Sequence, residues 1–218
     1  MSKVIQVFHP SSQVFLTKAR DLSTNTEAFA DLMRRIGYVL AAEVLKRSEF
    51  MLIPKSVMTP LHKLAHGYGF GGRVALVPVM RAGDILQEGF RTLTERPLIW
   101  HLSLARDEQT LKTQVYGVKV PKEAPPVGLT VVLEVMLATG GSAKTAIDIL
   151  KERHAQNIVF VCVVAAPEGI AALQEHHPDV DIYTIAIDDR LTGEGEAFPP
   201  GYIVPGLGDA GDRSYPIE

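Results

Sequence analysis

Two glycines and two hydroxyl side chains lie together near the middle of the chain, directly after an apolar run. The segment is Thr139-Gly140-Gly141-Ser142, and the carboxylate of Glu134 lies a few residues before it. Glycines let a backbone close around an anion without interference from a Cβ atom, and the N-terminus of a following helix adds positive charge. The spacing therefore indicates a phosphate site in which Thr139 and Ser142 are further donors. An ordinary strand-to-helix turn capped by Ser142 would explain the same spacing.

Arginine is the second residue type that could hold an anion. Arg81 directly follows the apolar run 73–79, and Ala82-Gly83 turns the chain from there into a predicted helix. Ligands of open α/β sheets bind at the carboxyl ends of the strands, so Arg81 is well placed for an anion, although a surface arginine has the same sequence context. Neither glycine of the pair is directly followed by Lys-Ser or Lys-Thr, as the P-loop pattern requires, which excludes a nucleoside-triphosphatase P-loop.

Histidine and cysteine give weaker chemical signals. His62 and His66 have a spacing known from metal-binding helices, but their segment carries no accompanying carboxylate or cysteine. Solvated or packing histidines are therefore the better interpretation. Cys162 is the single cysteine and lies in the apolar run 158–164, where we expect a buried thiol. A lone cysteine cannot form an intrachain disulfide, and it fits a reducing, cytoplasmic compartment.

Alternating strand-like and helix-like segments must position these side chains. Strands are expected at residues 4–8, 73–79, 97–104, 131–133, 157–164 and 180–187. Helices are expected from a capping box at Thr24–Glu27 to about Arg47, and at residues 85–93, 143–153 and 167–175. This alternation predicts a single α/β domain with a mostly parallel central sheet that helices cover on both faces.

Two segments do not fit the core pattern. Residues 112–120 alternate loosely and are followed by several prolines, which predicts a β-hairpin arm outside the core. From residue 188 onward the chain is rich in glycine and proline, yet it contains the apolar Tyr202, Ile203 and Leu207. A loop of this length in a compact domain is usually functional, and its apolar residues argue against a frayed tail.

Composition narrows the class of protein. The chain has 218 residues, of which 46% are hydrophobic, enough for one α/β domain with a sizeable core. Its net charge of −3 indicates neither the basic surface of a nucleic-acid-binding protein nor a polybasic patch for a membrane surface. The first residues lack the apolar region of a signal peptide, and no apolar run is long enough to cross a bilayer. We therefore expect neither nucleic acid nor membrane among its partners.

Five motifs, in the same order along the chain, resemble the uracil phosphoribosyltransferase family. They are Arg81-Ala-Gly83, Arg106-Asp-Glu-Gln-Thr-Leu111, Met136-Leu-Ala-Thr-Gly-Gly-Ser142, Ala165-Ala-Pro-Glu-Gly169 and the stretch from Tyr202 to Asp212. Within the last of them, Pro205-Gly-Leu-Gly-Asp209 is the most specific, because the glycine loop alone would indicate only some phosphoribosyltransferase. The resemblance implies a phosphoribosyltransferase-like fold for residues 1–218, in which residues 188–218 form a hood over the base site.

The resemblance also implies an activity, the transfer of ribose 5-phosphate from 5-phosphoribosyl 1-diphosphate (PRPP) to uracil. The products would be UMP and pyrophosphate, as in pyrimidine salvage. The residues that it assigns to PRPP are Arg81, Arg106, Glu134, Val135, Met136, Leu137, Ala138, Thr139, Gly140, Gly141, Ser142 and Asp209. Those that it assigns to uracil are Ile203, Gly208, Asp209 and Ala210. The candidate catalytic groups among all of these are Arg81, Arg106, Glu134 and Asp209.

Cofactor and assembly follow from the same resemblance. It implies Mg²⁺ that is bound mainly through PRPP, rather than in a metal site made by the protein alone. It also implies a homodimer or homotetramer, to which the arm at residues 112–120 would contribute. The resemblance also suggests GTP as an allosteric activator.

Three positions depart from the family pattern. Glu134-Val135 stands where the family usually has Asp-Pro, and Asp84 stands where leucine usually follows Arg-Ala-Gly. A carboxylate at position 84, close to pyrophosphate, would either repel it or help to hold Mg²⁺. The segment 192–200 is longer than the usual link. The departures keep two alternatives open: a catalytically weak relative that binds PRPP or a nucleotide as a regulatory module, and an enzyme of the same fold that uses another base.

Overall fold

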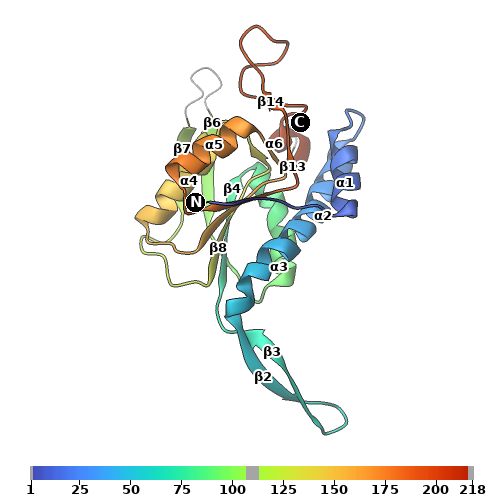
Figure 1. The fold of residues 1–218 in the computed structure, drawn as a ribbon, viewed down its shortest axis with the longest axis vertical. Helices are drawn as coiled ribbons and strands as arrows, with labels where there is room; N and C mark the ends of the chain where they lie inside the picture. The colour runs from blue at the N-terminus through green and yellow to red at the C-terminus, as the bar shows by residue number, and fades with distance from the viewer. Residues whose placement is uncertain (1, 107–112, 216–218) are drawn as a thin grey trace.

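The centre of the molecule is an eight-stranded sheet, seen in a computed structural model that describes residues 2–106 and 113–215 (Figure 1). The strand order is β1-β12-β10-β8-β4-β6-β7, and β5 pairs with β4 beside this path. Among the described residues, neighbouring strands of this sheet run parallel except β6 and β7. The strands are β1 (Val4–Gln6), β4 (Val74–Met80), β5 (Leu98–Ile99), β6 (His101–Arg106), β7 (Thr113–Lys119), β8 (Leu129–Leu133), β10 (Ile158–Val161) and β12 (Asp181–Thr184).

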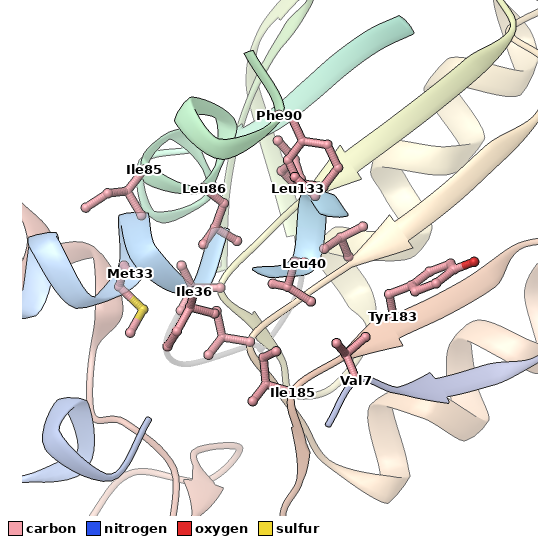
Figure 2. Close-up of a cluster of buried hydrophobic side chains, with 14 of the residues drawn as sticks. Val7, Met33, Ile36, Leu40, Ile85, Leu86, Phe90, Leu133, Tyr183 and Ile185 are labelled. Carbon is pink, nitrogen blue, oxygen red and sulfur yellow. The ribbon is translucent and has the colours of Figure 1, made fainter. Parts of the chain in front are cut away.

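Helices cover both faces of this sheet. One face carries α1 (Pro10–Arg20), α2 (Thr26–Val44) and α3 (Gln87–Leu93), with the 3₁₀ helix η2 (Ala82–Leu86) before α3. The other face carries α4 (Gly141–Glu152) and α5 (Pro167–His176). Figure 2 shows the core under the first group, where Met33, Ile36 and Leu40 of α2 gather with side chains of the sheet.

The central strand β8 explains why its sequence is a continuous apolar run. Val131 and Leu133 belong to the buried cluster on one face, while Val132 between them belongs to the cluster on the other. A parallel strand with both faces covered has no exposed side that would favour polar residues. The predicted mostly parallel sheet with helices on both faces is confirmed.

Two helix predictions need correction. Asn25, rather than Thr24, is the N-cap of α2, and its side chain accepts a hydrogen bond of 2.9 Å from the N–H of Ala28. The helix ends at Val44, where the chain tightens into the 3₁₀ helix η1 (Leu45–Met51). The sequence prediction missed α1, which begins at Pro10, because proline ends a strand but also suits the first turn of a helix. Within residues 2–106 and 113–215, no helix is long and apolar enough to span a membrane.

Short strands continue the carboxyl edge of the sheet. β9 (Met136–Leu137), β11 (Val164–Ala165) and β13 (Ala186–Ile187) follow β8, β10 and β12 along the chain and pair in parallel. Nearer the C-terminus, β14 (Arg190–Leu191) and β15 (Ile203–Val204) pair antiparallel and are followed by α6 (Ala210–Ser214). These elements hold the segments in which the phosphate and base motifs lie.

The arm that extends away from the body of the molecule is an antiparallel hairpin of β2 (Leu52–Met58) and β3 (Leu64–Phe70) (Figure 1). The β-hairpin arm predicted at residues 112–120 is confirmed in its antiparallel pairing but wrong in its placement, because Thr113–Lys119 form β7, which pairs with β6 as an edge strand of the main sheet. Loose alternation also suits an edge strand with one solvated face. Residues 107–112, which include most of the Arg106–Leu111 motif, lie outside the described residues. His62 and His66 fall in the turn and in β3 of the hairpin, so their spacing is not helical.

Candidate active site

A cleft of about 570 Å³ opens at the carboxyl edge of the sheet. It lies where β4, β6 and β8 end and where the chain passes from β9 into α4. Its lining brings together residues from most of the length of the chain: Val79, Met80, Arg81, Ala82, Ser103, Leu104, Ala105, Tyr116, Glu134, Met136, Leu137, Ala138, Thr139, Gly140, Gly141, Ser142, Ala143, Gly201, Tyr202, Ile203, Asp209 and Gly211.

The glycine segment forms one wall of the cleft. Gly140 has a φ of +83° and occupies the N-cap position of α4, so the cap itself has no side chain to accept hydrogen bonds from the first turn. The helix begins at Gly141, which puts Ser142 inside the first turn rather than at the cap. The first N–H groups of a helix have no partner within the helix, and here the first turn lines the cleft. This geometry suits an anion better than it suits a turn capped by Ser142.

The Ala165–Gly169 motif supports this segment from behind. The N–H of Ala166 donates to the carbonyl of Leu137 at 2.9 Å. A Cβ atom on Gly169 would lie 2.3 Å from the carbonyl oxygen of Ala138, so this close approach of the start of α5 requires glycine. The motif therefore acts through the backbone and does not line the cleft itself.

Glu134 and Val135 lie in different surroundings although they are neighbours in the chain. Glu134 lines the cleft, and its N–H extends the pairing of β8 with β10 by donating to the carbonyl of Val161 at 3.0 Å. Burial, reinforced by the negative charge of Glu134, raises the pKa of the Cys162 thiol to about 12. The side chain of Val135 is fully buried in the core and lies outside the lining of the cleft.

Arg81 lines the cleft at the end of β4, but its guanidinium is turned toward the C-terminal helix. Nη2 lies 2.6 Å from Oδ1 of Asp212, and Nη1 donates to the carbonyl of Tyr215 at 3.3 Å. The peptide bond between Met80 and Arg81 is cis. The other predicted arginine, Arg106, ends β6 with its backbone, whereas its side chain lies outside what the structure describes.

Part of the C-terminal segment covers one side of the cleft, as the predicted hood would. Ile203 lines the cleft from β15, and Asp209 lines it from the N-cap of α6, where its carboxylate accepts from the N–H of Asp212 at 2.9 Å. Gly208 and Ala210 flank Asp209 but are not part of the lining. Of the residues predicted to bind uracil, the structure thus brings two to the wall of the cleft.

The structure contradicts the expectation that Asp84 lies beside an anion in the cleft. Its carboxylate accepts a hydrogen bond from Nε2 of Gln87 and lies 3.5 Å from the hydroxyl of Tyr215 and 3.9 Å from Nε2 of His101. It lines a separate hollow between α2 and α3. Substitution of the usual leucine by aspartate therefore changes the wall of that hollow.

Sequence reasoning missed the side of the cleft formed by β6 and β7. Residues 103–105 of β6 and Tyr116 of β7 line it. The position of residues 103–105 at the carboxyl end of a predicted strand was a usable signal, because ligands of such sheets bind there. Tyr116 gave none, since its segment had the pattern of an arm.

A parallel sheet whose carboxyl edge joins a glycine loop, an acidic residue, an arginine and a C-terminal cover defines the phosphoribosyltransferase class. Structural similarity agrees with this fold. APRTase from Giardia lamblia superposes with a TM-score of 0.50 at 12% identity, over 74% of this chain and 86% of that one, which shows the fold alone. The AQ2163 protein from Aquifex aeolicus superposes with a TM-score of 0.85 at 30% identity, over 99% of both chains.

Sequence similarity gives the family. The family model for uracil phosphoribosyltransferase matches residues 6–216. Uracil phosphoribosyltransferases from Enterococcus faecalis and Levilactobacillus brevis are 45% and 44% identical to this chain over 215 residues, which is 99% of each sequence. The chain belongs to the uracil phosphoribosyltransferase family and is a transferase.

Proposed function

We propose that this chain transfers ribose 5-phosphate from PRPP to uracil, giving UMP and pyrophosphate in pyrimidine salvage. The observation that carries the proposal is the cleft, because it joins the glycine segment 139–142 to Arg81, Glu134 and Ile203. These groups match the chemical parts of the two substrates: a phosphate, a pyrophosphate, a ribose and an apolar ring.

PRPP would lie along the wall formed by β4, β9 and α4. The first turn of α4 supplies N–H donors for the 5-phosphate, with the hydroxyls of Thr139 and Ser142 beside them. The carboxylate of Glu134 accepts hydrogen bonds from ribose hydroxyls, and Arg81 and Arg106 neutralise pyrophosphate. Met136, Leu137 and Ala138 line the same wall, whereas Val135 contributes only its backbone.

Uracil would lie between this wall and the hood. Ile203 offers an apolar face to the ring, and backbone groups at Asp209, which lines the cleft between Gly208 and Ala210, would match its carbonyl acceptors and N–H donors. Cytosine has the opposite hydrogen-bond character at one edge and would leave a buried group unpaired, so the site discriminates against it.

Catalysis would depend on stabilising the charges that develop as the bond at the anomeric carbon breaks. Positive charge develops on the ribose while negative charge develops on the departing pyrophosphate, and arginine side chains stabilise the second of these. The described residues contain no cluster of three metal-binding side chains. Glu134 and Asp209 nevertheless line the cleft, which fits Mg²⁺ held by one or two carboxylates and substrate phosphates. When bound, this ion would neutralise part of the pyrophosphate charge.

Purified protein mixed with PRPP, Mg²⁺ and labelled uracil tests the function directly by formation of UMP. Competition among uracil, cytosine, adenine and guanine tests the choice of base. Binding of PRPP by calorimetry without turnover of any base would favour the regulatory module instead. The variant Arg106→Ala should raise the PRPP concentration needed for half-maximal rate while the circular dichroism spectrum stays unchanged.

We further propose that the protein assembles into a homodimer or homotetramer through the β2–β3 hairpin. Apolar side chains are exposed along this hairpin, and they are Leu52, Ile53, Val57, Met58, Leu61, Leu64 and Tyr68. Apolar patches of this kind often mark protein–protein contacts. Light scattering of the wild type and of the double variant Val57→Glu/Leu64→Glu tests the proposal, which requires a lower mass for the variant. A separate experiment, the addition of GTP to the UMP assay, tests whether GTP activates the enzyme.

A further inference from the structure

A buried carboxylate lies behind the base side of the cleft, outside its lining. Asp188 directly follows β13, and its side chain is 4% exposed. It forms a two-point ion pair with Arg20 at the end of α1, with Nη2–Oδ1 and Nη1–Oδ2 distances of 2.6 and 2.9 Å. Its N–H donates to the carbonyl of Ala165 at 2.8 Å, which ties it to the strand β11.

The same ion pair holds both backbone groups of Gly206. The N–H of Gly206 donates to Oδ2 of Asp188 at 2.9 Å, and the carbonyl of Gly206 accepts from Nη1 of Arg20 at 3.2 Å. Gly206 has a φ of +64°, and a Cβ atom there would lie 2.1 Å from the carbonyl oxygen of Ile203. The turn at Gly206 is therefore folded tightly against Ile203, which forms the apolar wall of the cleft.

This arrangement connects the two halves of the cleft. Asp188 follows the strand β13, which lies in the same small sheet as β9, and β9 leads into the glycine segment. Gly206 lies between Ile203 and Asp209, the two hood residues predicted to contact uracil that line the cleft. An ion pair at this junction therefore links the hood turn at Gly206 to the small sheet that leads into the phosphate wall.

We propose that Asp188 and Arg20 are positioning residues for the uracil half of the site. They act through the turn at Gly206, and they contact neither substrate. The inference rests on the proposed placement of uracil against Ile203. Removing one partner of a buried pair leaves an uncompensated charge and lowers stability, and because the two-point geometry of this pair is strict, its substitution also displaces the turn that it holds.

The test compares Asp188→Asn and Arg20→Lys with the wild type in separate titrations of uracil and PRPP. Asparagine keeps an acceptor for Gly206 but places an amide where Arg20 needs a carboxylate, and lysine removes the two-point contact. We expect the KM for uracil to rise about tenfold or more, since small misplacements at a site are costly, while the KM for PRPP changes less than about twofold. If Asp188→Asn does not fold, the Arg20→Lys titration decides.

Asp181→Asn is the matched control. Asp181 also pairs with an arginine, Arg47, and is largely buried, but it lies at the start of β12, away from the carboxyl edge. It should lower thermal stability and leave both KM values unchanged. An unchanged KM for uracil, or equal rises for both substrates, in the Asp188 and Arg20 variants would overturn the inference.

Ile203→Ala separates this inference from the proposed base site. If Ile203→Ala raises the KM for uracil but the ion-pair variants do not, only the positioning role is lost. If Ile203→Ala leaves that KM unchanged, the proposed base site fails and the inference fails with it.

Discussion

Nη2 of Arg81 lies 2.6 Å from Oδ1 of Asp212, so the residue that follows β4 is tied to the C-terminal helix α6 at the side of the cleft. The carbonyl of Tyr215 adds a second contact to the same guanidinium. The arginine proposed for pyrophosphate therefore already has an anionic partner. Because Asp212 belongs to the hood, the Arg81 side chain connects the pyrophosphate side of the site to the base side.

The first prediction concerns Asp212→Asn. The pair is roughly half exposed, so its loss should change the free energy of unfolding by at most about 1 kcal/mol. The substitution removes a carboxylate that competes with pyrophosphate for Arg81, and we expect the Kd for PRPP in calorimetry to fall several-fold. A weaker affinity would mean that Asp212 orients Arg81 for its ligand rather than competing with it.

The second prediction concerns the carboxylate at position 134. Glu134→Gln keeps the size of the side chain but removes the charge that accepts hydrogen bonds from ribose hydroxyls. We expect kcat/KM for PRPP to fall roughly 10- to 100-fold, because hydrogen bonds to a charged acceptor contribute about 1.5–3 kcal/mol. Glu134→Asp keeps the charge with a shorter reach and should lose less. An inert wild type beside an active Glu134→Asp variant would instead identify a weakened catalyst.

The third prediction uses Gly169→Ala. The new Cβ would lie 2.3 Å from the carbonyl oxygen of Ala138, so either α5 or the glycine segment must move. We expect a loss of about 1–3 kcal/mol in the free energy of unfolding, together with weaker PRPP binding. Gly67→Ala in β3 is the control, since nothing lies within 4 Å of its added Cβ atom. Equal behaviour of the two variants would remove the support that we assign to Gly169.

The main sheet could be predicted because its signals are local. β4, β8 and β10 are short apolar runs, and α4 has apolar residues at helical spacing. The β2–β3 hairpin gave no such signal, because its residues have no core to face and Pro54 interrupts its first strand. Its pairing runs from Leu52 with Phe70 to Met58 with Leu64, a relation between segments that no local pattern reveals.

The site could be predicted as a set of segments but not as a set of side-chain directions. The glycine segment, Arg81 and Ile203 do line one cleft. The pairing of Arg81 with Asp212, and the approach of the Tyr215 hydroxyl to Asp84, depend on which polar groups the fold brings near. Spacing along the chain contains no such information.

The fourth prediction concerns the dependence of stability on alkaline pH. Cys162 is fully buried, and burial together with the nearby carboxylate raises the pKa of its thiol from 9.0 to about 12. Below pH 9 the thiol keeps its proton in both the folded and the unfolded chain. Between pH 9 and pH 12 the unfolded chain loses this proton while the folded chain keeps it. The folded state then binds more protons, so stability falls as pH rises, by up to about 1.4 kcal/mol per pH unit.

Cys162→Ala isolates this contribution. The cavity left by the substitution costs stability by an amount that does not depend on pH, whereas the thiol contribution is absent from the variant. Denaturant unfolding at pH 8 and pH 10.5 should therefore show the wild type losing about 2 kcal/mol more than the variant between the two conditions. Parallel losses in the two proteins would mean that the thiol ionises in the folded state as easily as in the unfolded chain, and that its surroundings are more open than the core described above.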